Sequence, residues 1–70
     1  MNIDKWEGPY KVRAFDWVDG ESIYLNIAYY APGASLSRPP AEEKSVLIPK
    51  AESHWLVTHL NSVVYSLMQG

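Results

Sequence analysis

The dipeptide Asp19-Gly20 lies between two segments in which apolar and polar residues alternate. Asp-Gly is a strong signal for a two-residue hairpin turn, because both central residues of that turn have positive φ, which glycine allows and aspartate tolerates. We therefore predict that residues 10–31 form a β-hairpin with Asp19 and Gly20 as its loop. Counting outward from this loop gives the strand pairs, from Asp16 with Ile23 to Tyr10 with Tyr29.

This register separates the side chains into two faces, because successive residues of a strand point to opposite sides. One face is apolar apart from Asp16 and is expected to be the core face: Tyr10, Val12, Ala14, Ile23, Leu25, Ile27 and Tyr29. The other face mixes polar residues with four large rings: Lys11, Arg13, Phe15, Trp17, Ser22, Tyr24, Asn26, Ala28 and Tyr30. A slip by one residue would place aliphatic side chains opposite polar ones, so the alternation and the turn predict the same register.

Two segments outside the hairpin lack a regular pattern. Residues 1–9 are predicted to be an irregular lead-in, because Gly8-Pro9 is a turn signal directly before the first predicted strand. Residues 32–44 are predicted to be a loop, because they are mostly polar and contain Pro39-Pro40, which favours extended backbone.

A third strand and a helix complete the predicted fold. Residues 45–48 are a short apolar run that ends at Pro49, which suits a strand. Residues 50–68 contain neither glycine nor proline and have Gly70 beyond their end, which suits a helix. Its apolar stripe would comprise Leu56, Leu60, Val63 and Leu67, widened by Val57, Val64 and Met68. This stripe needs an apolar partner, and the core face of the hairpin is the one available. We therefore predict one α+β domain over residues 1–70, in which one C-terminal helix covers an antiparallel three-stranded sheet (β-β-β-α).

Charge and composition narrow the function classes. The formal net charge is -2, which argues against a protein that binds the nucleic-acid backbone. Residues 1–9 are partly charged and no stretch approaches the ~20 apolar residues of a membrane span, so we expect neither a signal peptide nor a membrane partner. The chain has no cysteine, which fits a reducing compartment, and we expect a cytoplasmic location.

Few residues are candidates for catalysis or metal binding. His54 and His59 lie five residues apart and would point about 140° apart on the predicted helix, too far to chelate one ion together. Asp16 falls on the core face, where an unpaired carboxylate is unfavourable, so we expect it beside solvent or paired with a lysine or a helix N-terminus. A catalytic carboxylate with a raised pKa is the alternative for Asp16. We predict a protein that is not an enzyme and has no metal or cofactor site.

The polar and aromatic face of the hairpin is the candidate recognition surface. Aromatic residues make up 13% of the chain, and the simplest interpretation is that they fill the thin core of a small domain. Aromatic residues and arginine are also enriched at protein interfaces. The predicted contact residues are Arg13, Phe15, Trp17, Tyr24 and Tyr30. The predicted function is binding of a larger protein by stoichiometric occlusion or bridging, as in phage or mobile-element inhibitors of host enzymes or defence complexes.

Two alternatives remain open at this point. The rings beside Lys11 and Arg13 have the ingredients of a stacking platform for single-stranded nucleic acid, although two cations on a net negative chain predict weak binding. A second copy of the chain could bury a sheet edge or the aromatic face, which would make a small homodimeric structural protein. The sequence assigns neither the partner nor the position of the third strand in the sheet.

Overall fold

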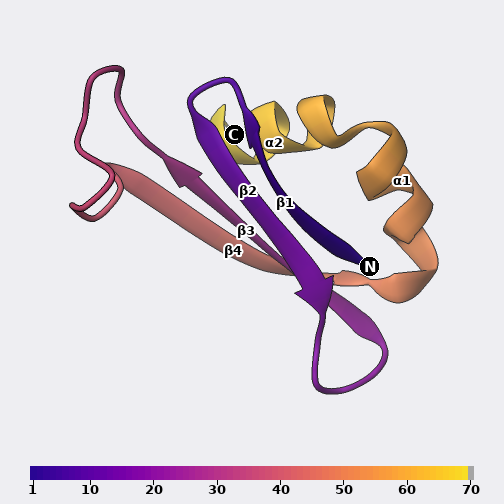
Figure 1. Cartoon of the computed structure of the whole chain (residues 1–70). Coiled ribbons are helices and arrows are strands. Elements are labelled where there is room, and N and C mark those ends of the chain that lie inside the picture. Colours follow the sequence, from indigo (N-terminus) through magenta and orange to yellow (C-terminus); the bar gives the residue numbers. More distant parts are fainter. Residues whose placement is uncertain (70) are drawn as a thin grey trace.

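A four-stranded antiparallel sheet is the scaffold of the fold. The computed structural model describes residues 1–69, and within them the strands are β1 (Asn2–Glu7), β2 (Tyr10–Asp16), β3 (Ser22–Tyr29) and β4 (Glu42–Pro49). The strands lie in chain order, β1-β2-β3-β4, so each pairs with the next along the sequence. A short 3-10 helix, η1 (Lys50–Glu52), leads into α1 (Ser53–Thr58) and α2 (Leu60–Gln69), which cover one face of the sheet (Figure 1). The predicted α+β class is confirmed.

The register of the β2–β3 hairpin is the predicted one, but its loop differs. Tyr10 pairs with Tyr29 and the pairing continues to Asp16 with Ile23. The Gly20 N–H donates to the Trp17 carbonyl at 3.1 Å, and no residue other than glycine in residues 1–69 has positive φ. The predicted two-residue turn at Asp19-Gly20 is therefore wrong, and the loop spans residues 18–21. Both loops have the same centre, which is why the strand pairs are unchanged.

The Asp19 side chain holds this longer loop together. Its carboxylate accepts hydrogen bonds from the Glu21 N–H at 2.8 Å, from the Ser22 N–H at 2.9 Å and from the Ser22 hydroxyl at 2.8 Å. Aspartate is favoured in turns for this kind of bond to the backbone that follows it. These donors, the Glu21 N–H first, lower the pKa of Asp19 below its usual value because they stabilise the charged form.

Strand β1 occupies the segment predicted to be irregular, so that prediction is wrong. Its register with β2 runs from Asn2 opposite Phe15 to Glu7 opposite Tyr10. An edge strand needs few apolar residues, and here Ile3 alone of the six packs against the core cluster. The strand was missed because charged residues interrupt the alternation that identifies a strand in a sequence.

Strand β4 contains the third predicted strand, residues 45–48, but is longer than predicted at both ends. It pairs with β3, from Ser22 opposite Pro49 to Tyr29 opposite Glu42. The predicted loop over residues 32–44 therefore ends earlier, because residues 42–44 belong to the strand. Charged residues have low strand propensity, but they are tolerated at an exposed sheet edge.

The single helix predicted for residues 50–68 is wrong, because the helix is interrupted at His59. The backbone there has φ -124° and ψ 35°, outside helical values, and the preceding Val57 and Thr58 are β-branched. Gly70, predicted to follow the helix, lies outside the described residues. Neither α1 nor α2 approaches the length and apolar character that a membrane crossing requires in residues 1–69.

The core lies between the sheet and the two helices. Its buried members are Tyr10, Val12, Ala14, Ile23, Leu25, Ile27, Leu56, Leu60 and Val64. This confirms the predicted core face of the hairpin and most of the helical stripe, although Val57 is 61% exposed. Asp16 lies at the end of the sheet as expected, with its side chain 45% exposed and its Oδ2 3.7 Å from the Lys50 ammonium.

We expect Gly8→Ala to lower the free energy of unfolding by about 2 kcal/mol, because Gly8 has φ +59°, which strains any other residue. A Cβ there would also lie 2.9 Å from the hydroxyl of Tyr65, whose ring packs edge-on against Tyr10. The control is Gly33→Ala, where φ is +81° but no atom lies within 4 Å of the new Cβ. Thermal unfolding should show a larger loss for Gly8→Ala. Equal losses would contradict the contact with Tyr65.

Candidate recognition surface

The sheet face opposite the helices, called the outer face below, carries the predicted contact residues. The strand registers place on it Asn2, Asp4 and Trp6 of β1, Lys11, Arg13 and Phe15 of β2, Tyr24, Asn26 and Ala28 of β3, and Glu43, Ser45 and Leu47 of β4. Both helices of residues 1–69 lie on the other side of the sheet (Figure 1). No helix of residues 1–69 therefore covers the outer face, although on β3 Tyr24 and Asn26 are only partly exposed and Ala28 is buried.

Three of the predicted residues form one cluster, the aromatic triplet of Phe15, Trp17 and Tyr24. The Tyr24 ring centroid lies 5.1 Å from that of Phe15 and 5.1 Å from that of Trp17, with only 20° between the Trp17 and Tyr24 planes. Phe15 and Tyr24 are direct cross-strand partners, and Trp17 reaches them from two residues further along the same face. Each ring thus limits the motion of the others.

A polar network extends this triplet toward the edge of the sheet. The Tyr24 hydroxyl donates to the Ser45 hydroxyl at 2.8 Å, and the Asn26 amide donates to the same oxygen at 2.9 Å. The Asn26 amide also donates to the Glu43 carboxylate at 3.3 Å. These bonds fix the orientation of the Tyr24 ring. The cross-strand partner of Tyr24 on β4 is Leu47, which is 52% exposed.

Tyr30 does not join the triplet. Its ring pairs instead with Trp6 of β1, with 5.6 Å between the centroids, near the opposite end of β2. Lys11 lies 5.6 Å from the centre of the Trp6 ring and forms an ion pair with Asp4 at 2.8 Å. The hydrogen bond and charge of Lys11, with a weaker effect of Arg13, lower the pKa of Asp4. Sequence reasoning missed Trp6 because the segment around it was not recognised as a strand.

Arg13 lies between the two aromatic groups. It is exposed on β2, with Asp4 opposite it on one side and Asn26 on the other. Within residues 1–69 it makes no ion pair at 4.0 Å or less, so its guanidinium is available to an incoming carboxylate or carbonyl.

The histidines give no support for a catalytic or metal centre. His54 is exposed, and the His59 ring packs edge-on against Trp55 with 6.0 Å between centroids. Because the helix is interrupted at His59, the angle predicted for a continuous helix does not apply. No three histidine or acidic side chains of residues 1–69 lie close enough to hold one metal ion.

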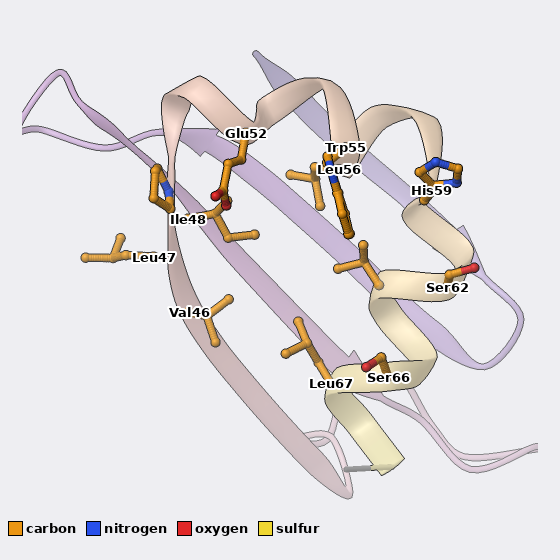
Figure 2. Close-up of a pocket in the computed structure, with 12 residues that line it drawn as sticks. Val46, Leu47, Ile48, Glu52, Trp55, Leu56, His59, Ser62, Ser66 and Leu67 are labelled. Carbon is orange, nitrogen blue, oxygen red and sulfur yellow. The ribbon is translucent and has the colours of Figure 1, made fainter.

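The helical side of the sheet has a second feature that the sequence did not predict. A groove of about 960 Å³ separates β4 from the helices (Figure 2). Its apolar lining comes from Val46, Ile48, Trp55, Leu56, Val63 and Leu67. Figure 2 shows the Trp55 side chain pointing from α1 into the groove and Leu67 of α2 facing Val46. The Lys44 ammonium donates to the Leu67 carbonyl at 2.8 Å and ties the end of α2 to β4.

In comparisons with known proteins, no protein family model, no curated protein and no solved structure matches this chain.

Proposed function

We propose that this protein is a non-enzymatic binding module whose outer face docks on a larger protein partner through the aromatic triplet and Arg13. The observation that carries the proposal is the packing of Phe15, Trp17 and Tyr24 against one another on a sheet face without helices. Tryptophan, tyrosine and arginine are the residues that most often dominate the binding energy of an interface.

Preorganisation supports this use of the rings. A ring held by its neighbours and by a bond such as that from Tyr24 to Ser45 has little rotamer freedom left to lose on binding. The rings lie side by side on the sheet and not around a cavity, which suits a protein surface better than a small molecule. We therefore propose occlusion or bridging of that surface as the mode of action, as in a phage or mobile-element inhibitor of a host enzyme or defence complex.

Single-stranded nucleic acid is the weaker candidate. The outer face places Lys11 and Arg13 between two groups of rings, which is the layout of a stacking platform. However, Lys11 is already paired with Asp4, and Glu43 adds a further negative charge to the same face. The positive potential needed to attract phosphates is therefore small.

Affinity capture with the double variant Trp17→Ala, Tyr24→Ala tests the proposal. Tagged wild-type protein should retain a partner from a lysate of the source organism, and the double variant should lose it, because two rings of the triplet are removed. The matched control is His54→Ala, Val57→Ala, which changes two exposed residues of α1 outside the outer face and the groove.

Circular dichroism separates loss of binding from loss of fold. If the double variant unfolds, the rings are part of the core and the proposed surface does not exist. Equal capture by the double variant and the wild type would also contradict the proposal. Quenching of tryptophan fluorescence by single-stranded oligonucleotides at low salt, reversed by added salt, would favour the nucleic-acid candidate instead.

A further inference from the structure

β4 is an edge strand with backbone groups available for pairing. The Lys50 N–H donates to the Glu21 carbonyl at 2.8 Å, continuing the β3–β4 register beyond the strand. In an antiparallel pair alternate residues bond to the partner, so Val46 and Ile48 bond to β3 and their neighbours do not. The peptide groups that face away from β3 are those of Glu43, Ser45 and Leu47, followed by Pro49, which offers only its carbonyl.

The groove lies directly beside this edge. Val46 and Ile48 point to the helical side of the sheet and are only half-buried, because α1 and α2 do not extend over β4 (Figure 2). Trp55 is 57% exposed although it points into the groove. An occupant that supplies both a strand and apolar side chains would pair the free peptide groups and cover these residues together.

The charges along β4 are complementary to a second copy of β4 in one register. If Val46 pairs with Val46 of the second copy, Glu42 lies opposite Lys50 on the helical side. In that register Lys44 lies opposite Ile48, so one charge faces an apolar residue. If Ser45 pairs with itself, Glu42 lies opposite Ile48 and Lys44 opposite Val46, so both charges face apolar residues. If Leu47 pairs with itself, Lys44 lies opposite Lys50 and like charges meet. The peptide groups that face away from β3 oppose one another in all three registers, so the charges select the first, in which Ser45 pairs with Leu47.

We infer that β4 binds β4 of a second copy in antiparallel orientation, about a two-fold axis at Val46, with the two grooves meeting over the junction. The result is one continuous sheet, because a two-fold axis perpendicular to the sheet keeps the helices of both copies on the same side. Trp55 of each copy then lies over the first half of the other β4, toward Leu67 of that copy. The dimer also presents two aromatic triplets on one outer face, which gives a bivalent surface.

Exchanging the charges at positions 42 and 50 tests this register, with the mass in solution measured by sedimentation equilibrium. Wild-type protein should show a concentration-dependent mass that reaches that of two chains. Glu42→Lys and Lys50→Glu should each weaken the dimer about tenfold, since each places like charges together twice in the symmetric interface. The double variant Glu42→Lys, Lys50→Glu should restore it. Both residues are exposed, but Lys50→Glu also replaces the ion pair with Asp16 by two like charges, so circular dichroism of each variant must show the wild-type fold before its mass is interpreted. A monomer at all concentrations, or equal dimerisation by all variants, would overturn the inference.

Backbone substitutions test the edge independently of charge. Leu47→Pro removes an N–H that faces away from β3 and should abolish the dimer, whereas Leu47→Ala keeps that N–H and should dimerise. The matched control is Asp4→Pro, which makes the same change on the edge of β1 and should leave dimerisation intact. Amide exchange of the wild type should show protection at Ser45 and Leu47 that rises with protein concentration.

The same variants also distinguish dimerisation through β4 from dimerisation through the outer face. If Trp17→Ala, Tyr24→Ala abolishes self-association while Leu47→Pro does not, the copies associate through the triplet and the β4 interface is excluded. Protection at Ser45 and Leu47 that does not change with concentration would likewise exclude it. Partner capture through the outer face is tested separately, so failure of the β4 interface leaves the proposed function standing.

Discussion

Leu25→Ala should lower the free energy of unfolding by about 3 kcal/mol, one of the largest effects expected of any single substitution in this chain. Leu25 is 0% exposed at the centre of the core face of β3. The substitution loses the burial of the removed carbons and leaves a cavity that helices α1 and α2 can only partly fill. A domain this small loses roughly 15 °C of melting temperature for such a change. Thermal or denaturant unfolding followed by circular dichroism measures the loss.

Leu36→Ala is the matched control for this experiment. It makes the same chemical change in the loop between β3 and β4, where Leu36 is 64% exposed. Its effect on the free energy of unfolding should stay within about 0.5 kcal/mol, as for most surface substitutions. If the two variants were equally stable, the core would not lie where the strand register places it.

Trp17→Ala should weaken binding of the captured partner by roughly 30-fold, which corresponds to about 2 kcal/mol. Trp17 stacks on Tyr24 and lies within 6.5 Å of Phe15 between ring centroids, so its loss removes a large ring and loosens two others. Titration calorimetry with the purified partner measures the change in affinity.

Trp6→Ala serves as the comparison for Trp17→Ala, because it removes the same side chain from the same face of the sheet. Trp6 belongs to the separate pair with Tyr30 and is 44% exposed. If the aromatic triplet is the centre of the interface, Trp6→Ala should weaken binding of the partner only a few-fold. The reverse order, with Trp6→Ala the more damaging variant, would move the interface centre to the pair of Trp6 and Tyr30.

The hairpin was predictable because two independent signals agreed in it. Alternation of apolar and polar residues assigned the faces, and Asp19-Gly20 placed the reversal between the strands. The loop conformation was not predictable in the same way, because it depends on the three hydrogen bonds that the Asp19 carboxylate accepts. The register was insensitive to that error, since the loop lengthened by one residue on each side.

Strand β1 and the break between the helices were not predicted for the same physical reason: both depend on tertiary contacts and not on local pattern. β1 is specified mainly by its pairing with β2, with Ile3 as its apolar contact. The break at His59 involves neither glycine nor proline, the residues that signal a helix end in a sequence. Tertiary context overrides local propensity at both places.

The candidate site was predictable to the extent that it depends on the β2–β3 register. Phe15, Trp17 and Tyr24 were expected on one face and lie within contact of one another. Tyr30 was expected with them, but it lies at the other end of the hairpin, where β1 supplies Trp6. The groove beside β4 could not be predicted from the sequence, because it depends on where the helices lie on the sheet and no local pattern contains that information.

The strand order β1-β2-β3-β4 has a consequence for how the chain folds. Each strand pairs with the one made immediately before it, so the sheet can grow in the order of synthesis, with residues 30–41 between β3 and β4 as its longest loop closure. The apolar face of that growing sheet is covered only by residues 53–69, which follow all four strands. The apolar face of the sheet is therefore buried only once these last residues pack on it.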